Sequence, residues 1–168
     1  MTRDEVLREL REKRAEFDRL LEQIPGARLA EKCPGGEHSP RDIVCHVAAY
    51  DDLMVKRLRC AADGKSTAFD RDQTGWEVFN ERVWAEAVAL DTETVLVRAA
   101  ETFLDLLDEV NLLSDEDLES TEPLTGLAQH IDPGWLKGHA LCELIGTDGF
   151  EHYPMHYAQL AAAAAYVS

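Results

Sequence analysis

The sequence predicts an all-α protein, and two observations carry that prediction. Leu, Ala, Glu and Arg are abundant among the 168 residues, a composition typical of helical proteins. Apolar residues also recur at steps of three and four over long stretches, the spacing that gathers them on one face of a helix. At this length we expect one domain spanning residues 1–168, with a core large enough to fold without disulfide bonds.

The first two expected helices have clear start signals. The first spans residues 3–24, and Thr2 with Glu5 three positions later forms the pattern of a capping box. The second opens at Ser39, a natural N-cap, and Pro40 suits the first helical position because its missing amide donor is not needed there.

A long connection covering residues 65–90 follows the second helix. Its length lets the second and third helices run parallel, which a short turn would forbid. Within it, G-W-E-V-F-N-E-R-V-W at residues 75–84 has helical spacing. Side chains at such spacing usually belong to the core, so four of them are expected to seal a flank of the bundle; a cap over a pocket mouth is the alternative. The four are Trp76, Phe79, Val83 and Trp84.

The third helix is expected over residues 92–113, with Asp91 as its N-cap. A short capped turn at residues 114–118 should follow it. Residues 119–133 contain Pro and Gly interruptions and are predicted to form a loop. Trp135 is expected to fill an apolar gap near the last helix.

The last helix should begin between residues 135 and 141 and continue to about residue 167. Pro154 lies inside it, and a proline there lacks an amide donor and frees the carbonyl four residues earlier. We therefore expect a kink between His152 and His156. A proline beside candidate ligands indicates a functional constraint. The alternative is a bend that only fits the helix around the bundle.

His152 and His156 are four residues apart, so a helix places both imidazoles on one face, one turn from each other. Two neutral imidazoles so placed can converge on one cation. His46, on the second helix, is the expected third ligand. Taken alone, His46 would be a half-buried histidine satisfied by a hydrogen bond. Considered with the pair, it completes a predicted metal site of His46, His152 and His156.

A three-histidine site leaves at least one coordination position open for water or substrate. Imidazole suits zinc, nickel, copper and iron, and of these divalent ions we expect zinc or nickel. Three residues are candidates to orient the imidazoles by hydrogen bonds, namely Asp51, Glu151 and Gln159. Three further histidines lie in or near loops and are left out of the site: His38, His130 and His139.

Charge and composition exclude several classes of partner. The net charge is −16, from 17 basic and 33 acidic side chains, so we expect no nucleic-acid partner and no anionic membrane partner. The longest apolar run, residues 161–167, is shorter than the ~20 residues that span a bilayer. The N-terminus is charged and lacks an apolar signal core, so the expected location is cytoplasmic.

The four cysteines form no C-x-x-C pair, which argues against a zinc ribbon or a thioredoxin-type motif. In a cytoplasmic protein they are expected to be free thiols. Cys45 and Cys142 lie in apolar helical stretches and should be buried. Cys33 lies in a Pro- and Gly-rich connection, where it could be exposed.

Two segments of the chain resemble the DinB-like superfamily, which includes the metal-binding domains of thiol-dependent maleylpyruvate isomerases. They are S-P-R-D-I-V-C-H-V at residues 39–47 and F-E-H-Y-P-M-H-Y-A-Q-L at residues 150–160. The resemblance implies an up-down-down-up four-helix bundle with a long crossover between helices two and three. It also implies that His46, His152 and His156 bind a divalent metal. Residues 75–84 look like the branch that includes colibactin self-protection proteins, whose members can lack the three histidines.

Two functions remain open at this point. Characterised members of the superfamily are often metal-dependent enzymes that act with a low-molecular-weight thiol, and many are dimers. The resemblance therefore implies a thiol-S-transferase, an isomerase or a hydrolase acting on a small electrophilic molecule, with a thiol as a possible cosubstrate and a homodimer as a possible assembly. The alternative is a non-catalytic bundle for small-molecule binding or self-protection, with a structural metal or none.

Overall fold

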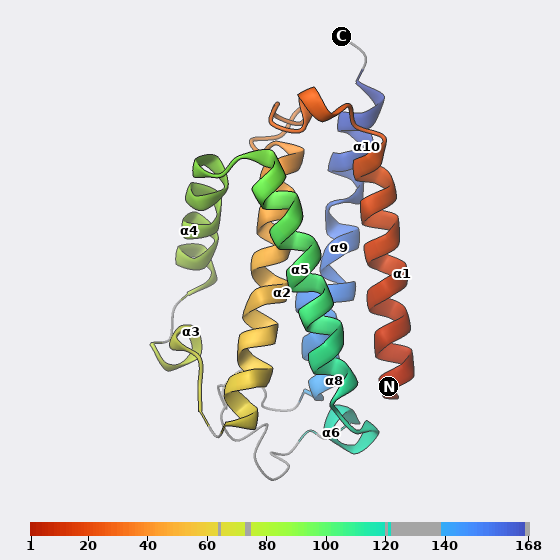
Figure 1. Ribbon diagram of the computed structural model, residues 1–168, viewed down its shortest axis with the longest axis vertical. Helices are drawn as coiled ribbons and strands as arrows, with labels where there is room; N and C mark the ends of the chain where they lie inside the picture. Colours follow the sequence, from red (N-terminus) through yellow and green to blue (C-terminus); the bar gives the residue numbers. More distant parts are fainter. Residues whose placement is uncertain (64, 73–74, 120, 122–138, 167–168) are drawn as a thin grey trace.

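The computed structural model describes residues 1–63, 65–72, 75–119, 121 and 139–166, and every regular element in these ranges is helical (Figure 1). The predicted all-α class is confirmed. Three long helices are continuous: α1 (Arg3–Glu22), α2 (Pro40–Ala62) and α5 (Thr92–Asn111). The fourth member of the bundle is built from four short pieces: α8 (Leu141–Ile145), the π-helical turn η2 (Gly146–Phe150), α9 (His152–Met155) and α10 (Tyr157–Ala165).

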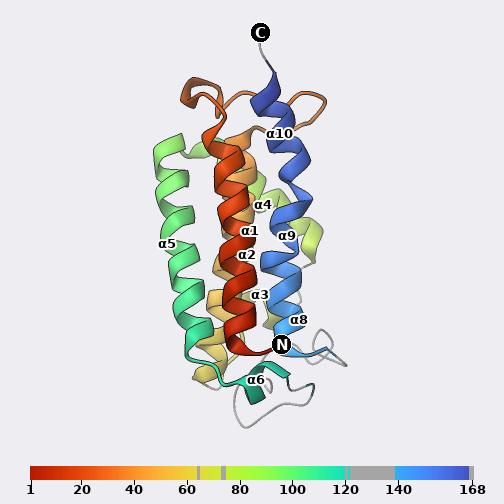
Figure 2. The ribbon, with the colours of Figure 1, turned by 90° about the vertical axis from the view of Figure 1, so that its right-hand side faces the viewer.

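The chain direction can be followed in the colours of Figure 1. It rises along α1, descends along α2, descends again along α5 and rises through α8 to α10. Figure 2 shows α1 between α5 and the last helical segment, and contacts join α1 to both. Helices α2 and α5 run in the same direction because the crossover between them returns the chain to the top.

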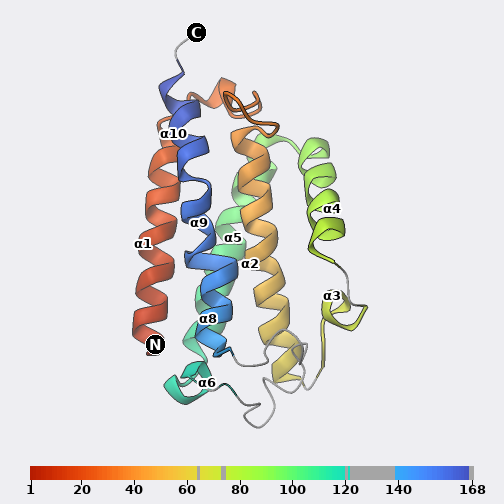
Figure 3. The same cartoon turned by 180° about the vertical axis from the view of Figure 1, so that it is seen from behind.

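The crossover contains two helices, α3 (Ala68–Arg71) and α4 (Trp76–Ala89). Helix α4 packs along α2 on the outside of the bundle, as Figures 1 and 3 show from opposite sides. Two short elements complete the fold, the 3₁₀ turn η1 (Gly26–Arg28) and α6 (Asp115–Glu119). The helical spacing of the crossover sequence therefore produces an additional helix on the flank of α2.

The helix starts follow the predicted caps. The Thr2 hydroxyl accepts a hydrogen bond from the Glu5 amide at 3.3 Å, while the Glu5 carboxylate accepts one from the Thr2 amide at 2.8 Å. Ser39 makes the same reciprocal pair at the start of α2, and Asp91 caps α5. The ends are less well predicted, because α1 and α5 each stop two residues early in a terminal turn closed by shorter-range hydrogen bonds.

The core lies among α1, α2, α5 and the last helical segment. It is lined by apolar side chains from all four, and its fully buried members include Val6, Leu10, Phe17, Ile43, Met54, Leu106, Ile145 and Leu160. Cys33 is 4% exposed and belongs to this core, so its expected exposure is wrong. Cys142 is buried as predicted, whereas Cys45 is only half-buried. Trp135 and almost all of the predicted loop at residues 119–133 lie outside the described residues.

The last helical segment is more irregular than a single proline kink. The Glu151 amide donates to the Gly146 carbonyl at 2.8 Å, a five-residue step that defines the π-helical turn before Pro154. A Cβ atom at Gly149 would lie 2.9 Å from the Leu10 side chain, so this turn brings the backbone unusually close to α1. The expected kink between the histidines is therefore part of a longer distortion that begins at Gly146.

No helix within the described ranges is both long enough and apolar enough to cross a membrane.

Candidate metal centre

The three predicted histidines meet inside the bundle. His46 comes from the first half of α2, His152 begins α9, and His156 lies at the junction of α9 and α10. Nε2 of His152 is 3.1 Å from Nε2 of His46 and 3.2 Å from Nε2 of His156. One nitrogen from each ring lies within 4.8 Å of the others, the arrangement of a candidate metal centre.

Burial keeps these imidazoles neutral. His46 and His152 are each 6% exposed, and His156 is half-buried. Burial, reinforced by repulsion from the neighbouring imidazoles, lowers the pKa of His46 to about 3. The same causes lower the pKa of His152 to about 4, and burial lowers that of His156. At neutral pH all three rings therefore keep one nitrogen lone pair, which a metal ligand requires.

The hydrogen bonds around the rings indicate where those lone pairs lie. Nδ1 of His156 is 2.9 Å from Oε1 of Gln159, which only accepts, so the proton belongs on Nδ1 and the lone pair on Nε2. The buried Nδ1 atoms of His46 and His152 have no partner with hydrogen-bond geometry, although the nearby Asp148 backbone opposes the burial that lowers the pKa of His152.

The Nε2 atom of His152 cannot satisfy both neighbouring rings by itself. A neutral imidazole nitrogen either donates one hydrogen bond or accepts with one lone pair, yet two other Nε2 atoms face this one. A cation between the rings would satisfy all three lone pairs at once. The donor set therefore fits a divalent metal with imidazole ligands.

The three residues expected to support the imidazoles have different positions. Gln159 bonds to His156 as described above. Asp51 instead accepts a hydrogen bond from the Tyr153 hydroxyl, because its place on α2 faces the residue next to His152 rather than the ring itself. Glu151 is exposed, and within the described residues it makes no hydrogen bond to a histidine.

Aromatic side chains surround the histidines on the side of α4. The Trp84 ring stacks on His46 with centroids 4.4 Å apart and planes 13° apart. Tyr50 packs 4.4 Å from His152 and donates a hydrogen bond of 3.0 Å to the Asn80 side chain of α4. The crossover helix thus covers the flank of α2 as expected and also reaches the candidate centre through Trp84 and Asn80.

Sequence reasoning missed Tyr50 and His38. Tyr50 follows His46 by one helical turn, a spacing that could have placed it beside the site. His38 stacks on the other face of Trp84, with centroids 3.7 Å apart, and no local pattern signals this contact. Of the other excluded histidines, His139 pairs with Glu143 at the surface, and His130 lies outside the described residues.

Two buried polar contacts join α2 to the last helical segment on either side of His152. The Tyr153 hydroxyl bonds to Asp51 at 2.8 Å, and Nη1 of Arg57 donates to Asp148 at 3.1 Å. Arg57 also pairs with Asp70 of α3 at 2.7 Å, so the same guanidinium holds the crossover. Burial raises the pKa of both Asp51 and Asp148 to about 7. These contacts keep the distorted segment in register with His46.

Fold and site together define a helical bundle with an internal cluster of three histidines. The comparison with known families is specific: the chain belongs to the DinB superfamily, whose model matches residues 9–143. A search of curated proteins gives no match.

Solved structures share this fold over nearly the whole chain. The colibactin self-resistance protein ClbS, solved in complex with a double-stranded DNA, aligns with a TM-score of 0.79 and 14% identity over 99% of this chain and 98% of its own. An uncharacterised protein from Escherichia coli UTI89 aligns with a TM-score of 0.78 and 18% identity, over 97% and 92% of the two chains. A Streptococcus pneumoniae protein gives 0.76 and 13%, over 95% and 88%. At these identities the similarity establishes the fold.

Proposed function

We propose that this protein binds a divalent metal ion through His46, His152 and His156 and is a metal-dependent enzyme acting on a small electrophilic molecule. The observation that carries the proposal is the convergence of three Nε2 atoms, with His152 only 3.1 and 3.2 Å from its two neighbours. Neutral buried rings and the Gln159 bond to His156 support it. Zinc and nickel are the expected ions.

The chain's own residues prepare this centre for chemistry. Gln159 holds the proton of His156 on Nδ1 and so keeps Nε2 free. Trp84 and Tyr50 cover the rings of His46 and His152 and exclude water from that side. The chemistry that a divalent cation would supply here is Lewis acidity, which activates thiols or water at neutral pH and polarises carbonyl groups.

Reactants are proposed to enter beside His156. This ring is half-buried, whereas His46 and His152 are enclosed, and the adjacent Met155 is 72% exposed. A small electrophile and a low-molecular-weight thiol would therefore meet at the most open of the three ligands. This arrangement suits thiol transfer, isomerisation or hydrolysis, the reactions implied by the resemblance to DinB-like enzymes.

A second candidate is a self-protection protein that captures a reactive small molecule, with a structural metal or none. The observation that favours it is the alignment with ClbS over 99% of this chain. ClbS was solved with double-stranded DNA, but a net charge of −16 favours a small-molecule target for the present chain. In this case removal of the metal would alter stability without abolishing a reaction.

Metal binding is tested by titrating metal-free protein with zinc and nickel, comparing wild type with H152A and H139A. Loss of a central ligand should abolish tight binding in H152A, while H139A should match wild type because His139 pairs with Glu143 at the surface. Equal binding by wild type and H152A would contradict the site.

The two candidate functions differ in a second measurement. Wild type, chelated protein and H152A would be assayed with a chromogenic electrophile and a panel of low-molecular-weight thiols. Turnover that depends on both zinc and His152 supports the enzyme. Metal-dependent thermal stability without turnover supports the self-protection bundle.

A further inference from the structure

His46 lacks the polar support that orients a typical metal-ligating histidine. Such a ligand usually donates its second ring N–H to an acceptor, which fixes the ring plane. His156 has this support from Gln159 at 2.9 Å. The Nδ1 atom of His46 is buried without a hydrogen-bond partner, so no polar contact at that atom sets the rotation of its ring.

Aromatic rings, rather than a hydrogen bond at Nδ1, pack against the imidazole of His46. Trp84 lies nearly parallel to the His46 ring, with planes 13° apart and centroids 4.4 Å apart. His38 covers the opposite face of Trp84 at 3.7 Å and 11°, so the indole is held between two imidazoles. Tyr50 meets His46 at 60° and closes a second side. Rotation of the His46 ring out of its plane would collide with the indole.

The position of Trp84 depends on how the crossover helix docks. On α4 only Val83 and Ala87 are buried, and Asn80 bonds to the Tyr50 hydroxyl of α2. Trp84 follows Val83 directly, but Trp76 and Phe79 of α4 also pack on the Tyr50 ring, with centroids 5.2 and 5.3 Å away, so the docking that places Trp84 does not rest on Val83 alone. The crossover thus sets the orientation of a ring that belongs to a different helix.

We propose that Trp84 is the positioning residue for His46, which it holds in the ring plane that directs Nε2 toward His152 and His156. The inference rests on the proposed metal site and assigns a role to a residue that is not a ligand. Without the indole, His46 would sample other ring rotations, and the metal affinity of the centre would fall. A ring of similar shape at position 84 should preserve most of the effect.

Three variants separate positioning from general packing. W84L removes the ring but keeps apolar volume, W84F keeps a smaller ring, and V83A weakens the docking of α4 without removing a contact to His46. Zinc affinity would be measured by competition with a chromophoric chelator, on protein shown to be folded by circular dichroism. We expect W84L to bind zinc about 10 to 100 times more weakly, the usual loss on removing support from a ligand. W84F and V83A should stay within a few-fold of wild type.

A measurement on metal-free protein tests the role independently of metal binding. Long-range proton–nitrogen NMR spectra of the imidazoles should show one environment for His46 in wild type and V83A. In W84L the His46 signals should broaden or split, because the ring is no longer held. Unchanged His46 signals in folded W84L would overturn the inference, and so would unchanged zinc affinity in a wild type that binds zinc. A wild type that binds no zinc would instead contradict the proposed function.

Discussion

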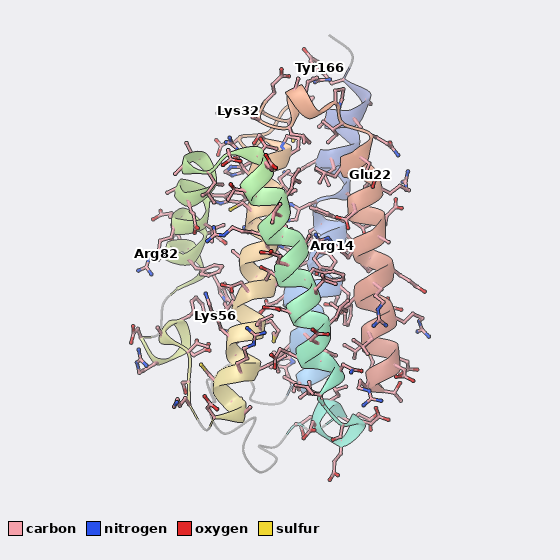
Figure 4. All side chains as sticks on the ribbon, viewed as in Figure 1. Arg14, Glu22, Lys32, Lys56, Arg82 and Tyr166 are labelled. Atoms are coloured by element: carbon pink, nitrogen blue, oxygen red, sulfur yellow. The ribbon has the colours of Figure 1, made fainter. Side chains whose placement is uncertain are left out.

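The Tyr153 hydroxyl donates a 2.8 Å hydrogen bond to Oδ1 of Asp51, and this contact fixes the residue beside His152 to the middle of α2. Both side chains are fully buried. The second Asp51 oxygen has no hydrogen-bond partner and lies 3.7 Å from Nη1 of Arg14, which points into the bundle from α1 (Figure 4). The register of the distorted last segment therefore depends on the buried carboxyl group of Asp51, of which only one oxygen is hydrogen-bonded.

Replacing Tyr153 by Phe removes this hydrogen bond while keeping the ring. The Asp51 carboxyl group would lose the only hydrogen bond that it makes to the described residues, so we expect the free energy of unfolding to fall by about 1–3 kcal/mol. Urea denaturation measures the change. Y157F is the matched control, because Tyr157 is half-buried and its hydroxyl donates to the Lys13 carbonyl at 2.6 Å. Equal losses in the two variants would show that the hydrogen bond to Asp51 stabilises the protein no more than the one from Tyr157 to Lys13.

The buried carboxyl of Asp51 should make stability depend on pH. Burial raises its pKa from 3.8 to about 7, against the opposing effects of Arg14 and Tyr153. The folded state then keeps a proton that the unfolded state releases, so this contribution to stability is full below pH 3.8 and is lost as pH rises through 7. D51N removes the titration and should lose less stability than wild type as pH rises.

Urea unfolding of metal-free wild type and D51N at about pH 5 and about pH 8 measures this difference. For one proton, the free energy of unfolding can change by at most about 1.4 kcal/mol per pH unit. The depressed pKa values of His46 and His152 act in the opposite direction, since their contribution is lost as pH falls below 6.5. They are common to both proteins and cancel in the comparison. Parallel pH profiles for wild type and D51N would contradict a raised Asp51 pKa.

Arg57 provides a second test of the contacts that hold the site. Its guanidinium is buried and pairs with Asp70 and Asp148, so R57M would leave two buried carboxyl groups without their cation. Breaking such a buried pair lowers the free energy of unfolding by about 3–5 kcal/mol. Arg59 is the control on the same helix, because its side chain is 52% exposed and its ion pairs lie in solvent. R59M should change stability by less than about 1 kcal/mol, and a similar loss in both variants would contradict the argument.

Local patterns predicted the helical frame and the proximity of His152 to His156, while metal binding by the three histidines stays a prediction. Thr2 and Ser39 specify helix starts through bonds to residues three positions later, so local sequence was sufficient. The rings of His152 and His156 lie close together even though Pro154 and the π-helical turn interrupt the helix, because four residues still span roughly one turn. The position of His46 opposite them was expected from its place on the second helix and from the family resemblance, not from a local spacing.

Contacts between distant segments were beyond local reasoning. Trp84 lies 38 positions after His46, and the loop residue His38 reaches the same indole, so no periodicity connects the three. Asp51 was expected to orient an imidazole, but the rotation of the last segment brings Tyr153 to it instead. The π-helical turn was also missed, because a close approach of Gly149 to Leu10 depends on how α1 packs. These are tertiary relations, and they determine the fine geometry of the site.

Binding to double-stranded DNA can be tested directly, because ClbS was solved in complex with DNA whereas the present chain is strongly acidic. A net charge of −16 opposes approach to phosphates, and 13 of the 17 basic residues are already in ion pairs with acidic side chains in the described structure. We therefore expect no binding of a labelled duplex of about 20 base pairs by fluorescence anisotropy, even at about 50 mM salt, where phosphate contacts are strongest. A basic duplex-binding protein of similar size serves as the positive control. Binding that weakens steeply with added salt would contradict this expectation and would show a basic surface that the overall charge conceals.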